Sequence, residues 1–206
     1  MQIEGISKRR KGLTCLTVDG EEVLVDTEVF LLSGYAAPCS ITAEGLQKLQ
    51  ADSDYKRAKE RALWYLSRGD LSEKGLYDKL ARAFPKSAAA AAVARIKDLG
   101  LVNDQAYARR LAKALVEEKH LSARMAGVQM MQKGISRQLA EEALSELEPD
   151  NTAAAVALIE KKYKNKLSTP DDLRRTYAAL QRRGFTYSEV RAALAEYNAN
   201  LEFEEE

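Results

Sequence analysis

The chain has 206 residues with a formal net charge of +1; 46% of its residues are hydrophobic and 31% are charged. This many apolar side chains can form a hydrophobic core, which excludes a chain that is disordered throughout. Residues 1–55 carry 5 basic and 9 acidic side chains, whereas residues 56–198 carry 27 basic and 18 acidic ones. An acidic N-terminal segment is therefore followed by a basic segment, which suits contact with an acidic surface of protein or nucleic acid.

The first expected element is a β-hairpin. The segment LTCLTVDGEEVLVDTEVFLL alternates apolar and polar residues around Asp19-Gly20, which predicts strands at 13–18 and 22–26. Because a two-stranded ribbon is marginally stable alone, it should pack on the Ile3–Ile6 segment or on the first helix. A short helix over ITAEGLQKLQ, with Thr42 as its N-cap, should follow.

Beyond residue 50 the sequence is helical almost throughout, and its caps predict nine helices of roughly 11 to 16 residues between 55 and 198. The segment Thr169-Pro170-Asp171-Asp172 combines an N-cap, a first-turn proline and two acids at the positive end of a helix dipole. Thr186 with Glu189 forms a capping box. Further N-caps are expected at serines and helix ends at glycines; these are Ser72, Ser122, Ser136, Gly100, Gly134 and Gly184.

The nine helices are three copies of a three-helix unit. At an offset of 50 residues, Leu71-Ser72 aligns with Leu121-Ser122 and Asp171-Asp172, and Leu80 with Met130 and Leu180. Self-similarity at a fixed period indicates supersecondary units that bury their faces on neighbours. We therefore predict a mainly α fold: three tandem three-helix repeats forming an elongated curved rod, with a small N-terminal β-hairpin module. The expected domains are 1–50 (β-hairpin module with short helix), 51–101, 102–149 and 150–198 (repeats 1 to 3), and 199–206 (acidic disordered tail).

No catalytic site is expected from the sequence. His120 is the only histidine, and its place in the polar run EEKH at a helix end is typical of an exposed cation near the negative end of the helix dipole. The adjacent acids Asp171-Asp172 and Glu141-Glu142 are typical of helix first turns and exposed faces. Nucleophile-elbow, Walker, dinucleotide-binding and HExxH motifs do not occur. We predict that the protein is not an enzyme and has no catalytic residue, metal site or cofactor.

The cysteines and the N-terminal sequence indicate in which cellular compartment the protein is expected. Cys15 and Cys39 lie far apart and outside any zinc-binding spacing. The opening MQIEGISKRRKG lacks the apolar run of a signal peptide, and no segment approaches the roughly 18 apolar residues that span a bilayer. A cytoplasmic protein without membrane contact is expected.

Basic residues form short clusters that are candidates for partner binding. They lie before the hairpin, in the fourth helix of the nine, at the end of the seventh and along the eighth. Arg174 and Arg175 lie eight and seven residues before Arg182, about two helical turns, so these side chains can share one face. For any single basic residue the alternative is a solvated face paired with nearby acids. For the group in the third repeat, a partner-binding role is favoured.

Aromatic residues mostly fall at positions that helical periodicity assigns to the cores between helices. The residues so assigned are Trp64, Tyr65, Tyr77, Tyr107, Tyr163, Tyr177, Phe185 and Tyr197. Tyr187 is expected to be exposed, because it lies in a first helical turn outside the apolar stripe. The complete set of predicted partner-binding residues, for a filament or for DNA, is Arg174, Arg175, Arg182, Arg183, Lys161, Lys162, Lys164, Arg109, Arg110 and Tyr187.

Four segments of the chain resemble the RecX family of regulatory proteins. They are RALWYLSRGDLSEKGLYDKL at 61–80, GLVNDQAYARRLAKALVEEKHLS at 100–122, QKGISRQLAEEAL at 132–144 and LQRRGFTYSEVRAAL at 180–194. The opening IEGISKRRKGLTCLTVDGEEVLVDTEVF also resembles the N-terminal extension of longer members. The order of the segments and their 50-residue register carry the resemblance. Members often have Arg and Glu where this chain has Gly69 and Gly75. The resemblance therefore supports partner contacts by the first repeat less than it supports those by the third.

The resemblance implies a modulator of the RecA recombinase that has no catalytic centre. Such a protein lies in the groove of the RecA–DNA filament and inhibits strand exchange, ATP hydrolysis and co-protease activity. The implied processes are recombination, DNA repair and the SOS response. We expect a monomer whose partner is the RecA filament, with at most weak contact to DNA.

Two other functions stay open on the residues alone. Three-helix units resemble helix-turn-helix modules, and Lys and Arg contacts to phosphates would bind DNA without sequence preference. The net charge of only +9 over residues 56–198 and the lack of a strand platform of aromatic and basic residues argue against that function. A passive scaffold, which would bind neither DNA nor the recombinase, is the third reading.

Overall fold

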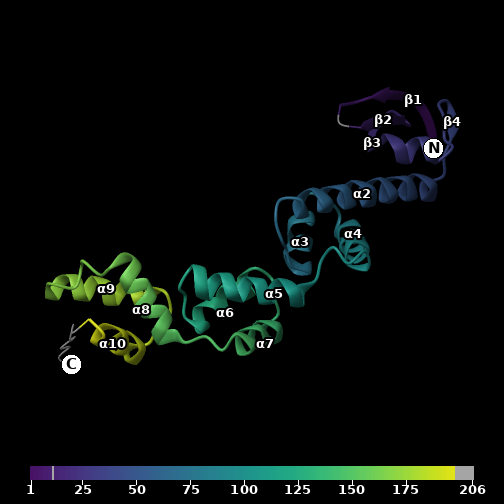
Figure 1. Cartoon of the computed structure of the whole chain (residues 1–206). Helices are drawn as coiled ribbons and strands as arrows, with labels where there is room; N and C mark the ends of the chain where they lie inside the picture. Colours follow the sequence, from purple (N-terminus) through teal and green to yellow (C-terminus); the bar gives the residue numbers. More distant parts are fainter. Residues whose placement is uncertain (11, 198–206) are drawn as a thin grey trace. The chain divides into compact units, whose positions relative to one another are not determined.

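The Asp19-Gly20 turn sets the register of the N-terminal sheet in the computed structural model, which describes residues 1–10 and 12–197 (Figure 1). Asp19 and Gly20 have φ angles of 48° and 84°, as a two-residue hairpin turn with a left-handed backbone requires. The turn joins strands β2 (Leu13–Val18) and β3 (Glu21–Asp26), which pair antiparallel with Val18 opposite Glu21. The predicted hairpin is therefore confirmed.

The hairpin belongs to a larger sheet than the sequence predicted. Strand β1 (Gln2–Lys8) pairs with β2 on one side and with the short β4 (Cys39–Ser40) on the other, which gives the order β3-β2-β1-β4. Helix α1 (Thr27–Leu32) covers it, with the Asp26 carboxylate as its N-cap. This helix was not predicted, because TEVFLL continues the alternation of the preceding strand.

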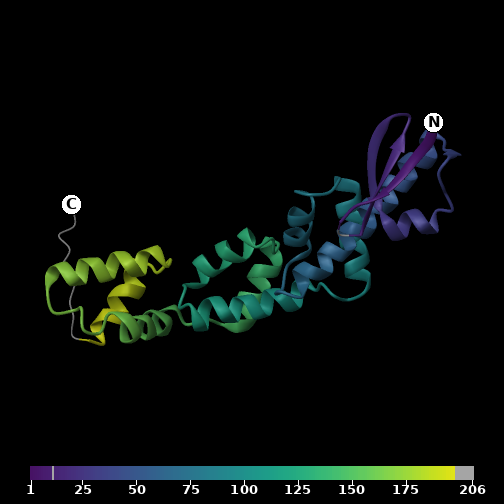
Figure 2. The ribbon, with the colours of Figure 1, turned by 90° about the horizontal axis from the view of Figure 1, so that it is seen from above.

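Helix α2 (Ala43–Leu66) begins after the predicted N-cap Thr42 and continues well beyond the short helix that the sequence indicated. Its first half packs Leu46 and Leu49 on the core of the sheet, and its second half packs Ala58 and Ala62 in the core of the first repeat. Figures 1 and 2 both show the sheet beside this helix. The sheet and the first repeat thus share one helix.

A polar contact fixes α2 to the sheet. The Lys56 ammonium lies 2.8 Å from the buried Asp26 carboxylate and 2.8 Å from that of Glu28, and the Ser53 hydroxyl accepts the backbone N–H of Asp26 at 2.7 Å. Burial raises the pKa of Asp26, but the Lys56 hydrogen bond and the backbone N–H groups of the cap outweigh it and hold the pKa below its ordinary value. Asp26 is therefore a charged partner of Lys56.

The first repeat consists of α2, α3 (Glu73–Leu80) and α4 (Lys86–Asp98). Leu76, Leu80 and Ile96 are fully buried between these helices. The Ser72 hydroxyl caps α3, and Gly100, which follows the end of α4, has a φ of 69°, as the sequence predicted. The sheet and this repeat make up the first of two units in the chain, Met1–Asn103.

The second repeat consists of α5 (Asp104–Lys113) with the π-helical turn η1 (Ala114–Glu118), α6 (Ala123–Gln132) and α7 (Arg137–Leu147). The third consists of α8 (Asn151–Lys162), α9 (Pro170–Arg182) and α10 (Tyr187–Ala195). Each repeat has its own buried cluster of apolar residues, and both belong to the second unit, Asp104–Glu206.

Capping confirms the predicted N-terminal ends of four of these helices, although α6 and α10, with 10 and 9 residues, are shorter than predicted. Ser122, Ser136 and Thr169 accept backbone N–H groups of the helices that follow them, and Thr186 with Glu189 forms the predicted capping box. Three tandem three-helix repeats behind a small β module are thus observed. Lys11 and the predicted tail 199–206 lie outside the described residues, and the curved rod stays a prediction.

Candidate partner-binding surface

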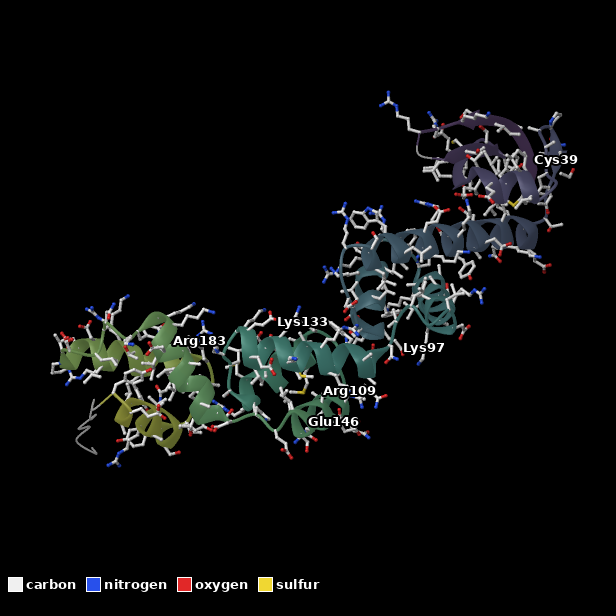
Figure 3. The ribbon with its side chains drawn as sticks, viewed as in Figure 1. Cys39, Lys97, Arg109, Lys133, Glu146 and Arg183 are labelled. Atoms are coloured by element: carbon white, nitrogen blue, oxygen red, sulfur yellow. The ribbon has the colours of Figure 1, made fainter. Side chains whose placement is uncertain are left out.

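The second and third repeats meet at a loop that follows the π-helical turn. The Arg183 guanidinium donates to the backbone carbonyl of Lys119, and the backbone carbonyl of Arg183 accepts the N–H of Ser122 at 3.1 Å. Between these contacts His120 has a left-handed backbone with a φ of 49°. Arg183, which the sequence predicts as a partner-binding residue, is therefore also anchored to the neighbouring repeat (Figure 3).

Basic side chains converge on His120. Its pKa is lowered by burial and by the nearby positive charges of Lys161, Arg183 and Lys162. A histidine with a pKa below the ordinary value is neutral at pH 7. The prediction of an exposed cation stabilised by the helix dipole is therefore wrong for His120, which is half-buried among cations. We name His120, Lys161, Lys162 and Arg183 the junction cluster.

The lysines of the junction cluster are open to a partner. Lys161 and Lys162 are both exposed at the end of α8, and within the described residues no carboxylate forms an ion pair with either. Lys164 differs, because its ammonium lies 2.5 Å from the Glu160 carboxylate. The two lysines thus present positive charge that no carboxylate of residues 1–10 and 12–197 compensates.

The arginines of α9 extend this charge. Arg174 and Arg175 are exposed, and their guanidinium groups lie 3.8 Å and 4.0 Å from the carboxylates of Asp171 and Asp172. Exposed pairs of this kind contribute about 0–1 kcal/mol, so both arginines can exchange these partners for others. Arg182 is exposed at the end of the same helix, two turns after Arg175 and therefore on a similar face.

Arg109 has a partner within its own repeat. Its guanidinium forms two hydrogen bonds to the Glu146 carboxylate, of 2.7 Å and 2.9 Å, which join α5 to α7 (Figure 3). The hydrogen bonds and charge of Arg109 lower the pKa of Glu146. Arg110, the next predicted residue, is exposed on α5. The structure thus assigns Arg109 a contact inside the second repeat.

The sequence predicted the exposure of one aromatic residue, Tyr187, correctly and that of another, Trp64, incorrectly. Tyr187 is exposed, as predicted, and its ring packs edge-to-face on that of Tyr177 with the centroids 5.9 Å apart. Trp64 was assigned to a core between helices, but 43% of it is exposed. That assignment is wrong, because Ala58 and Ala62 form the face of α2 that packs in the core.

Sequence reasoning missed the residues that hold the two repeats together. The side-chain carbonyl of Asn151 accepts the N–H of Ala123 at 2.9 Å, and its amide donates to Glu189 at 2.7 Å. Gly184 was predicted only as a helix end, but a Cβ there would lie 2.3 Å from the Ser122 hydroxyl. Local patterns give no signal for these contacts, since they join residues 28 to 62 positions apart.

Neither a metal site nor a membrane span is found in the described part of the chain. Residues 1–10 and 12–197 contain no group of three or more His, Cys, Asp or Glu side chains arranged to hold a metal ion. Among the helices of these residues, none is long and apolar enough to cross a membrane. Cys15 and Cys39 are free thiols.

Comparison with protein families gives a match for each helical repeat. Residues 58–95 match the first three-helix domain of RecX, residues 103–144 the second and residues 148–194 the third. These matches cover more than half of the chain.

Curated relatives and solved structures agree with these matches. The regulatory protein RecX of Caldanaerobacter subterraneus subsp. tengcongensis is 30% identical over 94% of this chain and 98% of its own length. That of Clostridioides difficile is 29% identical over 80% of this chain and 78% of its own. A crystal structure of regulatory protein RecX covers 91% of this chain and 96% of its own with a TM-score of 0.59 at 20% identity. RecX from Lactobacillus salivarius covers 70% and 97% with a TM-score of 0.57 at 24% identity; both structures show the shared fold.

Proposed function

Because this chain belongs to the RecX family of regulatory proteins, we propose that it binds the RecA–DNA filament and modulates, mainly by inhibition, its recombinase, ATPase and co-protease activities. The proposed processes are recombination, DNA repair and the SOS response. In this proposal the protein acts as a cytoplasmic monomer, without enzymatic activity or a cofactor.

The uncompensated charge of the junction cluster is the observation that supports this proposal best. The pKa of His120 is lowered first by its burial and then by the positive charges of Lys161, Arg183 and Lys162. No described carboxylate forms an ion pair with either lysine. Binding an acidic partner surface removes this repulsion and replaces it with attraction. Arg175 and Arg182 on α9 add further positive charge on the same repeat.

The mechanism that we propose is bridging of successive filament subunits. The arginines of α9 and the lysines of the junction cluster pair with acidic groups across the filament groove. A bridge of this kind resists the subunit rearrangements that ATP hydrolysis and strand exchange need, or blocks filament growth and so promotes disassembly. Because the contacts are charged, association is fast and weakens with salt.

The test measures the binding of charge-reversal variants to the ATP-bound recombinase–DNA filament, with ATPase activity followed in parallel. We expect Lys161→Glu/Lys162→Glu and Arg175→Glu/Arg182→Glu each to lower the filament affinity at least about tenfold, because reversed charges meet like charges on the partner. Arg183 is left intact, because its guanidinium anchors the two repeats.

The matched control is Arg137→Glu, which changes charge by the same sign on α7 at a side chain that is 82% exposed. Its filament affinity should stay close to that of the unchanged protein. Unchanged binding by both pairs of variants would show that these residues are not the filament contact. Equal binding to bare DNA and no effect on the recombinase would instead favour the sequence-nonspecific DNA-binding function, and binding to neither would favour a scaffold.

A further inference from the structure

The outer face of α2 carries an exposed aromatic surface that the proposed function does not use. Trp64 lies on this face and is 43% exposed, although burial of an indole is normally favourable. Its ring meets that of Tyr65 edge-to-face, with the centroids 5.2 Å apart. Trp64 is also the single tryptophan of the chain.

Basic side chains lie over these rings. The Arg68 guanidinium carbon is 4.1 Å from the centroid of the Trp64 ring, and that of Arg61 is 5.4 Å from it. Arg57 lies over the ring of Phe84 at 5.6 Å. All of these residues come from the first repeat. We name Arg57, Arg61, Trp64, Arg68 and Phe84 the α2 platform.

A groove of about 410 Å³ is lined by Trp64, Phe84, Arg57, Arg61 and, from β2, Leu13. This volume lies within the roughly 300–1,000 Å³ of ligand pockets. Two carboxylates, those of Asp26 and Glu60, also line the groove. Lys56 lies 2.8 Å from Asp26 and 3.3 Å from Glu60, and Arg57 lies 3.6 Å from Asp54. Arg61 and Arg68 form no ion pair within the described residues, so these two arginines are the cations available to a ligand.

We propose that the α2 platform binds single-stranded nucleic acid, with an unpaired base stacked on the Trp64 indole and phosphates held by Arg61 and Arg68. Stacking of a base on an aromatic ring is stronger than an exposed cation–π contact. A base can therefore displace one guanidinium from the indole, and the long arginine side chain can then turn to a phosphate. Aromatic rings interleaved with cations are the pattern that single strands require.

A nucleic acid fits this surface better than an acidic protein does. The guanidinium groups of Arg61 and Arg68 both lie over the exposed Trp64 ring. Two such cations beside one exposed ring match a strand whose phosphates alternate with stackable bases, whereas carboxylate side chains offer no aromatic ring to stack on the indole. The platform lies in the first unit, whereas the junction cluster lies in the second, so this proposal does not rest on the proposed function.

Fluorescence of the single tryptophan reports directly on the platform. We expect a 20-nucleotide oligo(dT) to quench the emission of the full-length protein saturably. In Arg61→Ala/Arg68→Ala the affinity should fall and its salt dependence should weaken. Loss of two phosphate contacts on a single strand makes the slope of log K against log salt shallower by about 1.4. A duplex of equal length should bind more weakly, because its bases are already stacked.

Trp64→Leu tests the stacking itself, with binding followed by the anisotropy of labelled oligo(dT). We expect the affinity to fall about 5- to 150-fold, the range for loss of one stacked base, and thermal stability to stay nearly unchanged because Trp64 is exposed. Arg95→Ala on α4 is the matched control: Arg95 is also exposed in the first repeat, and its loss should leave the affinity within about twofold.

The opposite results would overturn the proposal. Absence of quenching together with unchanged affinity of Trp64→Leu would show that oligo(dT) does not bind at the platform. Equal binding of the duplex and of oligo(dT) would exclude stacking of an unpaired base. Quenching by poly-glutamate but not by oligo(dT) would identify the platform as a docking site for an acidic protein.

Discussion

Gly184 occupies a position where the backbone angle and the neighbouring side chains both exclude a larger residue. Its φ is 92°, and a Cβ would lie 2.3 Å from the Ser122 hydroxyl and 2.7 Å from the Met125 Cβ. The sequence predicted the first constraint, since glycine commonly ends a helix. It could not predict the second, because the contact joins two repeats.

We predict that Gly184→Ala lowers the free energy of unfolding of the second unit by roughly 2–4 kcal/mol, through a strained backbone and overpacking. Gly100→Ala is the control: its φ is 69°, but no atom lies within 4 Å of the added Cβ, so only about 1–2 kcal/mol of backbone strain is expected. Urea denaturation measures both values. Equal losses in the two variants would mean that the junction adapts to the extra methyl group.

His120 makes the stability of the second unit depend on pH. Its folded pKa lies below the ordinary value of 6.5, so below pH 6.5 the unfolded chain binds a proton that the folded chain does not. This contribution therefore lowers stability as the pH falls from 6.5 toward the folded pKa, and it vanishes above 6.5.

We predict that His120→Asn loses less stability than the unchanged protein between about pH 7 and 5.5. Asparagine tolerates the left-handed backbone of this position, and carboxylates titrate alike in both proteins. Urea unfolding at the two pH values gives the comparison. Parallel losses in both proteins would show that His120 does not titrate differently on folding.

Helix α2 is the element that the sequence described least well. The run Asp52-Ser53-Asp54 is a poor helix former, and it separates the predicted short helix from the helices that follow. The structure continues the helix through this run, because Ser53 is buried and accepts the backbone N–H of Asp26. A tertiary contact thus determines that α2 continues through this run, which local helix propensity does not predict. The caps at Thr42, Ser72 and Thr186 were predictable because a cap depends only on neighbouring residues.

We predict that Asp26→Asn lowers the free energy of unfolding of the first unit by roughly 1–3 kcal/mol, because it removes a buried charged partner of Lys56 while the asparagine can still cap α1. Lys74→Met is the control: its exposed pair with Asp78, at 2.8 Å, contributes about 0.5 kcal/mol or less. If Asp26→Asn cost no more than this control, α2 would be held to the sheet by apolar packing alone.

At the scale of the whole molecule, the repeat architecture was predictable because caps and apolar residues recur at a fixed offset, although the second helix of the third repeat is capped by Thr169, three residues before the aligned position. The offset of 50 residues aligned Ser72 with Ser122, and both residues cap the second helix of their repeat. The candidate site was only partly predictable. Lys161 and Lys162 were recognised by their charge, but their approach to His120 depends on how the third repeat packs on the second. The core assignment of Trp64 failed because periodicity alone does not reveal which face of a helix its neighbours cover.

The continuity of α2 limits how the length of this part of the chain can change. The match to the first three-helix domain begins at residue 58, inside a helix whose first half packs on the sheet. One residue inserted between Leu49 and Ala58 would rotate the rest of α2 by about 100° and shift it by about 1.5 Å relative to the sheet. The insertion would then either move Lys56 away from Asp26 or turn the second half of α2 away from the core of the first repeat. We therefore expect insertions and deletions to be tolerated in the loops of the first unit but not in its longest helix.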